Sequence, residues 1–338
     1  MDEQLTVSSS PHIRADDNTR SIMTDMLIAL FFPLAVAFYF FGIRVLTLTC
    51  VSVLCCILFE YAYRKLLKKT RSIGDMSAAV TGVLLVSVLP PSTPYWMVAL
   101  GAFFAVVVVK QLYGGLGKNF LNPALAARAF LGGVASLSSF AEPLLENRFD
   151  LFGSADAVAA ATPLAGESLE KLYGGVTPFT WQDMFLGQIP GSIGEVSAAL
   201  LLLGGLYLLI RKVITLRIPL AFIGTVALLT FLFPRGGVAR LDFMVYNLLA
   251  GGLILGAVFM ATDYSTSPVT PRGQWLFGIG CGLLTVFMRY FAAMPEGVCY
   301  SILLMNTVVW TLDKVGRPRR FGVRLFGKKK EGSGASRA

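Results

Sequence analysis

Thr162 presents a single hydroxyl among very small side chains, in the stretch DAVAAATPLAG at residues 156–166. Three alanines precede this threonine and Pro163 follows it. Small neighbours let an extended chain enter the cleft of another protein, which suits a residue that an enzyme modifies. A threonine before proline is also a common turn or cap residue, and both interpretations stay open on these residues alone.

A glycine-rich stretch at 110–130, KQLYGGLGKNFLNPALAARAF, could bind an anion. Asn122 followed by Pro123 is typical of a helix N-cap with proline at the first helical position. The positive end of such a helix favours a negative charge. Further positive charge comes from Lys110, Lys118 and Arg128. An ordinary loop is the alternative.

A second unusual stretch, GGLILGAVFMATDYSTSPVTPRG, spans residues 251–273. Gly252 and Gly256 form a G-x-x-x-G pattern, which lets another helix approach closely. A flat ring lying against the bare backbone is the alternative interpretation. Asp263 and the hydroxyl residues around it could either cap helices or bind a polar head group.

Ionisable residues in or beside apolar runs are costly in a membrane and often functional. They are Asp25, Glu60, Asp75, Asp242, Arg289 and Glu296. Most lie near the ends of apolar runs, where they can meet lipid headgroups, but Glu60 lies deepest. We expect Asp25, Glu60 and Asp263 to line or border an ion path or a ligand pocket.

The sequence shows no dinucleotide fingerprint, no catalytic acid–base pair and no spacing of metal ligands. Its five cysteines lack a C-x-x-C pair and fall in or beside apolar runs, so we predict small buried side chains. His12 is the only histidine and lies in a polar tail. We therefore expect neither a catalytic residue nor a metal site in this chain.

The elements that carry these residues are predicted to be membrane helices. Of the 338 residues, 55% are hydrophobic and 14% are charged, whereas soluble domains are about 25% charged. Mean hydropathy is +0.68. Apolar runs of about 20 residues can cross about 30 Å of hydrocarbon, and helices satisfy the backbone there. The fold class is therefore an all-α membrane protein.

About ten spans are expected. They are 22–41, 45–63, 77–90, 95–110, 124–141, 196–211, 218–233, 243–262, 275–292 and 298–312. They divide the chain into an N-terminal segment 1–21, a first membrane half 22–141, a polar segment 142–195, a second half 196–312 and a basic tail 313–338.

The net charge of +9 lies mainly in short loops and the tail. The positive-inside rule then places both termini in the cytoplasm and the acidic segment 142–195 outside. No basic and aromatic interleaving suggests nucleic acid as a partner. The repeated hexapeptides GDMSAA at 74–79 and GEVSAA at 194–199 suit an inverted repeat, although chance or a shared capping pattern explains them equally well.

Six pieces of the sequence together resemble one known family. They are SPHIRADDNTRSIMTDMLIAL, GDMSAAVTGVLL, KQLYGGLGKNFLNPALAARAF, GSIGEVSAALLLLGG, GLILGAVFMATDYSTSP and PEGVCYSILLMN. In this order, from residue 10 to about residue 306, they resemble the D subunit of the Rnf electron-transport complex. They are more distantly similar to the B subunit of the sodium-pumping NADH:quinone oxidoreductase.

This resemblance implies that a flavin transferase attaches FMN to the Thr162 hydroxyl through a phosphodiester, giving a phosphoryl-threonine. Asp156, Ala161 and Thr162 match the acceptor pattern, while Ala159 and Ala160 stand where Ser/Thr and Gly/Ser are common. A second, non-covalent flavin such as riboflavin is implied between the helices. For such cofactors we expect contacts from Lys118, Asn119, Gly252 and Gly256.

The resemblance also implies a ten-helix bundle with inverted halves, similar to urea transporters, in a bacterial or archaeal cytoplasmic membrane. The complex would pass electrons between ferredoxin and NAD and export Na+ or H+. Partners would be the other Rnf subunits, including the FMN-bearing G-type subunit and iron–sulfur subunits, besides the transferase and membrane lipid. The alternatives are the quinone-reducing pump subunit and a urea- or water-type channel, since an NPA motif occurs at 122–124.

Overall fold

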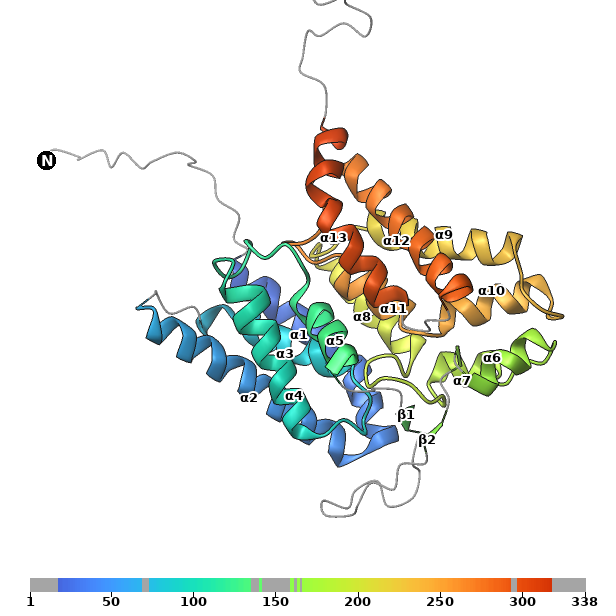
Figure 1. Cartoon of the computed structure of the whole chain (residues 1–338), viewed down its shortest axis with the longest axis horizontal. Helices are drawn as coiled ribbons and strands as arrows, with labels where there is room; N and C mark the ends of the chain where they lie inside the picture. Colours follow the sequence, from blue (N-terminus) through green and yellow to red (C-terminus); the bar gives the residue numbers. More distant parts are fainter. Residues whose placement is uncertain are drawn as a thin grey trace, which may run out of the picture.

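The computed structural model describes residues 18–68, 73–134, 140–141, 159–160, 163–164, 166–292 and 297–317. The first group of helices comprises α1 (Thr19–Phe41), α2 (Ile43–Leu66), η1 (Ile73–Asp75), α3 (Ser77–Ser87), α4 (Tyr95–Phe103), η2 (Phe104–Gln111) and α5 (Pro123–Val134). Figure 1 shows this group, blue to green, beside a second group in yellow to red.

The second group comprises α8 (Ala198–Ile210), α9 (Arg217–Leu232), α10 (Arg240–Leu249), α11 (Leu253–Leu255), η3 (Gly256–Met260), α12 (Pro271–Phe291) and α13 (Gly297–Gly316). Between the groups in sequence lie β1 (Phe140–Ala141), β2 (Ala159–Ala160), α6 (Gly166–Tyr173) and α7 (Trp181–Leu186). The two strands pair antiparallel, with Phe140 opposite Ala160. The described chain is thus helical apart from this short pair of strands.

Each predicted span contains a helix or a broken helix. The predicted span at 124–141 is too long, because α5 ends at Val134 and residues 140–141 form β1. By length and composition, three described helices can cross a membrane, namely α1, α2 and α13. A bent pair, α10 with α11–η3, meets the same test as a unit. Most other apolar helices are shorter, so the apolar character of the chain is confirmed while the number of full crossings stays a prediction.

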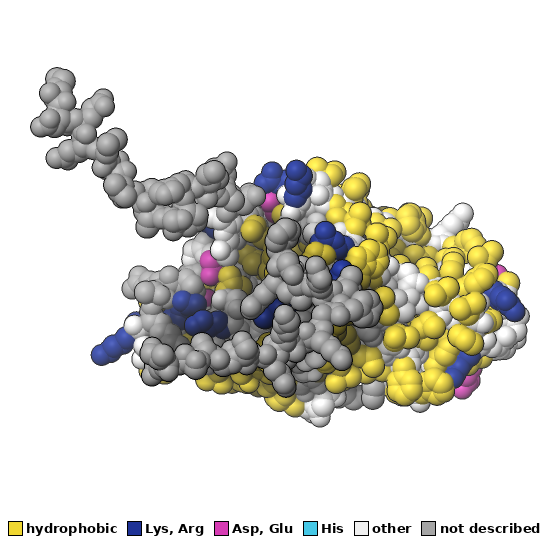
Figure 2. Space-filling model, turned by 90° about the horizontal axis from the view of Figure 1, so that it is seen from above, with side chains coloured by type: hydrophobic (Ala, Val, Ile, Leu, Met, Phe, Trp, Pro, Cys, Tyr) yellow, Lys and Arg dark blue, Asp and Glu magenta, His cyan; other side chains and the backbone are white. Residues whose placement is uncertain are grey.

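The outer surface of the bundle is hydrophobic, as a lipid-facing surface requires. Figure 2 shows hydrophobic side chains covering much of one face. Exposed side chains on α1, α2, α8 and α9 include Phe31, Leu58, Leu206 and Leu228. The prediction that the cysteines are buried is wrong for Cys50, which is exposed, and Cys55 is only half-buried. The opposite face of α2, with Ser52 and Cys56, is the buried one.

Some packed helix pairs lie within each group, and others join the two groups. Within the first group, α2 packs on α3 and α4; within the second, α9 packs on α10 and α12. The groups meet where α1 packs on α8 and α5 packs on α13. A Cβ on Gly204 of α8 would lie 2.5 Å from the Ala29 carbonyl oxygen of α1. Only glycine allows that approach.

The span containing α10 is broken inside the second group. The axis bends by 60° between α10 and α11–η3. Gly252 makes the break possible because it caps α11 in the left-handed region, with φ of 64°. The buried Arg289 of α12 stabilises it by donating to the carbonyl oxygens of Asn247 at 2.7 Å and Ala250 at 3.0 Å. A helix end within the bundle is thereby satisfied by a guanidinium.

Candidate functional site

A cavity lies between the two groups, at the end of the bundle where α1 and α3 begin. The space that it encloses, together with its open mouth, is about 690 Å³. Much of the wall is apolar, as at Met26 and Phe259. The polar lining is provided by Ser77, Lys110, Asn119, Asn122, Asp263 and Ser265. This composition is typical of a site for a small organic ligand.

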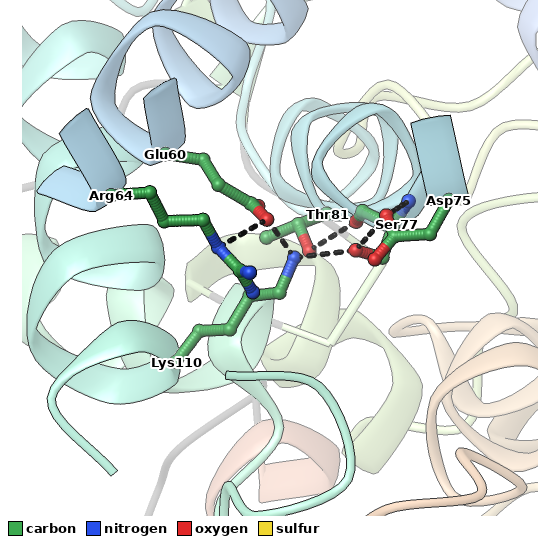
Figure 3. Close-up of polar contacts among 6 residues, drawn as sticks. All are labelled: Glu60, Arg64, Asp75, Ser77, Thr81 and Lys110. Carbon is green, nitrogen blue, oxygen red and sulfur yellow. Dashed lines mark hydrogen bonds and ion pairs between the residues drawn. The ribbon is translucent and has the colours of Figure 1, made fainter. Parts of the chain in front are cut away.

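Lys110 and Glu60 form a buried ion pair at the edge of this cavity (Figure 3). Their side chains are only 2% and 1% exposed. The Lys110 Nζ donates to Glu60 Oε2 at 2.8 Å and to Ser77 Oγ at 2.7 Å. The other Glu60 oxygen lies 3.5 Å from Arg64 Nε. Each of these charges needs its partner because an isolated charge in such surroundings is strongly destabilising.

Ser77 continues this hydrogen-bonded chain toward η1. Its hydroxyl donates to Asp75 Oδ1 at 2.6 Å, and its backbone N–H donates to the same oxygen at 2.9 Å. Asp75 is half-buried, unlike Glu60. A continuous chain of polar groups therefore runs from the buried Glu60 through Lys110 and Ser77 to Asp75, as Figure 3 shows.

Lys110 lies on a π-helix, the element η2. Here Leu112 N–H bonds to the Val107 carbonyl at 3.0 Å and Gly115 N–H bonds to the Lys110 carbonyl at 3.0 Å, both five residues apart. The π-helix η3, on the far side of the cavity, contributes Phe259 to its wall. Such wide turns are rare and frequently mark functional sites.

Asn119 is the predicted cofactor contact that the structure places in the cavity wall. It is 4% exposed. Its Nδ2 donates to the Leu121 carbonyl at 3.1 Å, while its Oδ1 has no hydrogen-bond partner among the described residues. A buried acceptor without a partner is destabilising unless a ligand or water satisfies it. Lys118, the neighbouring candidate, is exposed and does not line the cavity.

The predicted N-cap at Asn122 is confirmed. Its Oδ1 accepts from the N–H groups of Ala124 at 3.1 Å and Leu125 at 3.4 Å. The three cations proposed to strengthen an anion site there are not brought together. Lys110 pairs with Glu60, Lys118 is exposed, and Arg128 lines a separate cavity.

Asp263 lies on the cavity wall opposite Lys110, after η3. Its Oδ2 accepts from Ser265 Oγ at 3.0 Å and Thr266 Oγ1 at 3.2 Å. Burial raises the pKa of the Asp263 carboxyl, while these hydrogen bonds oppose the change. The side chain is thus a cavity-lining carboxyl, as predicted, within reach of a ligand or an ion.

Asp25 takes part in a contact between α1 and α8. Its Oδ1 accepts from the Tyr207 hydroxyl at 2.9 Å, and its Oδ2 lies 3.2 Å from both Nε and Nη2 of Arg211. Asp25 is not among the residues lining the cavity. This geometry gives Asp25 a structural function in joining the two groups, and its place on an ion path stays a prediction.

Gly252 and Gly256 lie at the second, smaller cavity, which measures about 340 Å³. A Cβ on Gly252 would lie 2.3 Å from Glu195 Oε1, and one on Gly256 would lie 2.4 Å from Val298 Cγ1. Packing against α13 accounts for Gly256, and the left-handed backbone conformation accounts for Gly252. Contact of either glycine with a flavin ring stays a prediction. Neither glycine lines the larger cavity.

The predicted acceptor residues Asp156, Ala161 and Thr162 lie outside the described residues. The chain on either side is described. Ala160 pairs with Phe140 in the two-stranded sheet. On the other side, the Pro163 carbonyl accepts from the hydroxyl of the fully buried Tyr246 at 2.8 Å.

A small apolar cluster also holds the backbone next to Pro163 in place. Leu164 packs there with Leu172 of α6, Met184 of α7 and Phe243 of α10. The backbone that follows Thr162 is therefore fixed to α10, at the end of the bundle opposite the large cavity.

Replacing Tyr246 with phenylalanine should lower the free energy of unfolding by about 1–3 kcal/mol, because the buried Pro163 carbonyl loses its donor. Added protease should also cleave between residues 141 and 166 faster, which a time course with mass spectrometry would measure. Tyr290→Phe is the control, since that hydroxyl donates to the Phe233 carbonyl instead. Equal cleavage rates in the wild type and Tyr246→Phe would contradict the anchoring function.

Sequence reasoning identified Glu60 and Lys110 separately but missed that they pair across 50 residues. It also missed Tyr246, which carries no motif. Arg289 stood out as an ionisable residue beside an apolar run, but its position at the helix break was not predicted. An arginine in an apolar run that follows a glycine pair was the available signal, because broken membrane helices need donors for their free carbonyls.

The apolar helical bundle and its broken span are those of a multi-pass membrane protein. The chain belongs to the NQR2, RnfD, RnfE family, whose model matches residues 6–322. The resemblance inferred from the sequence motifs is thereby confirmed.

Similar proteins extend along nearly the whole chain. The D subunit of the Na(+)-translocating ferredoxin:NAD(+) oxidoreductase complex of Acetobacterium woodii is 44% identical, over 96% of this chain and 97% of the relative. The D subunit of the proton-translocating complex of Clostridium ljungdahlii is 41% identical, over 95% of this chain and 97% of the relative. The D subunit of the ion-translocating oxidoreductase complex of Stutzerimonas stutzeri is 37% identical, over 91% and 93%.

Proposed function

We propose that this protein is the D-type subunit of an ion-translocating ferredoxin:NAD+ oxidoreductase of the Rnf kind. It relays electrons through covalent FMN and couples this transfer to export of Na+ or H+. The observation that carries the proposal is the full-length similarity to relatives named as such subunits. Within that complex, this chain works together with iron–sulfur subunits and the FMN-bearing G-type subunit.

Thr162 is the proposed attachment point of the FMN. Its hydroxyl oxygen attacks the FMN phosphorus of FAD and displaces AMP, so that a new P–O bond replaces the broken diphosphate bond. A flavin transferase catalyses this step. Support comes from the small residues before it and from the anchored Pro163 after it. When bound, the flavin supplies one- and two-electron redox chemistry, and the protein sets its position and surroundings.

Mass spectrometry of the peptide that carries Thr162 tests this proposal. Protein purified from a host that also makes the transferase should give that peptide with the mass of FMN less one water. Fragmentation should place the added mass on Thr162. An unmodified peptide from a complex that transfers electrons would show that the proposal is wrong.

The larger cavity is the proposed site of a second, non-covalent flavin. Asn119 Oδ1 offers an acceptor to a ring N–H, and Phe259 and Met26 offer apolar contact. These residues fit a flavin better than Gly252 and Gly256 do, because the cavity at the two glycines is smaller, about 340 Å³.

Glu60 and Asp263 are the proposed acidic groups on the ion path, on opposite sides of the same cavity region. Glu60→Gln keeps the shape of the side chain and removes its charge. We expect this variant of the complex to transfer electrons while moving fewer cations per electron, measured by cation uptake into liposomes. Unchanged cation transport would assign Glu60 to structure alone.

We further propose an inverted repeat similar to that of urea transporters. The helix pairs of the first group have counterparts in the second, with α2 on α3 and α4 matching α9 on α10 and α12. The similar hexapeptides at 74–79 and 194–199 do not precede helices that match in this way. One precedes α3, which packs on α2, whereas the other precedes α8, which packs on α1.

Orientation in a bacterial or archaeal cytoplasmic membrane follows from the charged loops. Reporter fusions at Gly166 and after Ala338 test this prediction. A periplasm-specific reporter should be active at Gly166, and a cytoplasm-specific one at the C-terminus, because Lys and Arg concentrate in the loops on the side of the termini. The reverse pattern would put the Thr162 flavin on the wrong side for this function.

A further inference from the structure

We propose that Lys110 is an internal counter-cation that closes Glu60 to the transported cation and must leave that carboxylate before the cation can bind. This inference rests on the ion-transport function proposed above and names the side chain that controls its site. The inference depends on the position of Lys110. This side chain is almost fully buried, and it contacts both Glu60 and the cavity.

The ammonium of Lys110 occupies the position that a small cation would need. It lies 2.8 Å from a carboxylate oxygen of Glu60 and 2.7 Å from the hydroxyl oxygen of Ser77. Carboxylate and hydroxyl oxygens are also ligands that hard cations prefer. A proton or a monovalent metal ion at Glu60 therefore competes with the Lys110 ammonium for the same oxygen atoms.

Within the described part of the chain, charged side chains near Glu60 lie on α2, η2 and η1. Arg64 lies on the same helix, α2, with its Nε 3.5 Å from Glu60 Oε1. Lys110 contributes the second positive charge from η2. Asp75 adds a negative charge beyond Ser77, from η1. Removing Lys110 takes away the positive charge that lies 2.8 Å from Glu60, so the carboxylate then attracts another cation.

The cavity offers the Lys110 ammonium a second position, away from Glu60. Lysine has a flexible four-carbon stem and a compact charge, and Lys110 already lines the cavity. Asp263 lies on the opposite wall, and Lys110 is near enough to stabilise its negative charge. If the Lys110 side chain rotates into the cavity, its ammonium leaves Glu60 of the first helix group and pairs with Asp263 of the second group. Glu60 becomes accessible to a cation as a result.

Dicyclohexylcarbodiimide reacts with a protonated carboxyl group in apolar surroundings, so it measures directly whether the Glu60 carboxyl can take up a proton. In membranes holding the assembled complex, wild-type Glu60 should be labelled weakly because the Lys110 ammonium contacts its Oε2 at 2.8 Å. Lys110→Met should raise labelling at Glu60 by about tenfold or more, since one partner charge is lost. Mass spectrometry locates the adduct, and Glu60→Gln shows the background.

Three further variants separate the closing function from general packing. Lys110→Arg keeps the charge and should be labelled as weakly as the wild type. Lys65→Met removes an exposed ammonium, 5.7 Å from the Tyr61 ring on the same helix, and should have no effect. Ser77→Ala leaves the ion pair in place and should give intermediate labelling, which keeps the test usable if Lys110→Met fails to accumulate.

Transport gives the second measurement. In liposomes containing the complex, Lys110→Met should move about tenfold fewer cations per electron, and Lys110→Arg should restore coupling. The inference is overturned if wild-type Glu60 is labelled as strongly as in Lys110→Met, if Lys110→Met stays unlabelled, or if it is labelled but fully coupled. A wild-type complex that moves no cation would instead refute the proposed function, while the labelling would still report on the pair.

Discussion

Thr162→Ala is expected to give a membrane protein without covalent flavin and at normal abundance. The hydroxyl oxygen is the only atom that the phosphodiester takes from the side chain, so alanine leaves the transferase without an acceptor. On a denaturing gel under ultraviolet light, the wild-type band should fluoresce and the Thr162→Ala band should be dark. Electron transfer through the assembled complex should fall sharply because one relay is missing.

Stability should be nearly unchanged in this variant. Thr162 lies in the polar segment predicted to be outside the membrane, and loss of one methyl and one hydroxyl at a surface position typically changes the free energy of unfolding by about 0.5 kcal/mol or less. Thr162→Ser keeps an alcohol and is the matched control, expected to retain some fluorescence. A Thr162→Ala band as bright as the wild type would place the flavin on another residue.

Lys110→Met is expected to destabilise the protein more than Thr162→Ala or Tyr246→Phe. It leaves Glu60, 1% exposed, without the cation that lies 2.8 Å away. Removing one partner of a buried ion pair typically costs about 3–5 kcal/mol. The loss should appear as a lower midpoint of thermal unfolding in detergent, followed by intrinsic fluorescence.

The double variant Glu60→Gln, Lys110→Met distinguishes a stranded charge from lost packing. Because neither charge then remains, it should recover much of the stability lost in Lys110→Met. Lys65→Met, at an exposed position on α2, should stay within about 0.5 kcal/mol of the wild type. A double variant less stable than Lys110→Met would show that the pair stabilises the fold mainly through packing.

Helix positions were predictable because each apolar run is bounded by glycine, proline or charge. The predicted span at 22–41 matches α1, and the run at 275–292 matches α12. Helix lengths were less predictable. The predicted span at 243–262 is two helices that meet at 60°, because Gly252 takes a left-handed conformation and Arg289 satisfies the free carbonyls. That arrangement depends on a residue far along the chain.

The acidic residues of the candidate site were predictable, but their partners were not. A deep carboxylate such as Glu60 stands out in any apolar run, because its burial requires a partner. The identity of that partner does not follow from sequence, since Lys110 reaches Glu60 across 50 residues and from a π-helix with an unusual phase. The partners of Asp25 were not predictable either, because the Tyr207 hydroxyl and the Arg211 guanidinium that contact it lie more than 180 residues further along the chain.

The hydrogen bond from Tyr246 to Pro163 also has a consequence for biogenesis. The two residues are 83 positions apart, with α8 and α9 between them. During synthesis the Thr162 segment therefore emerges well before its anchor exists. Only after α10 has been made and inserted can Pro163 take its place against Tyr246. A chain truncated before α10 lacks this anchor, so the timing of flavin attachment relative to insertion decides whether the transferase meets a free or a docked segment.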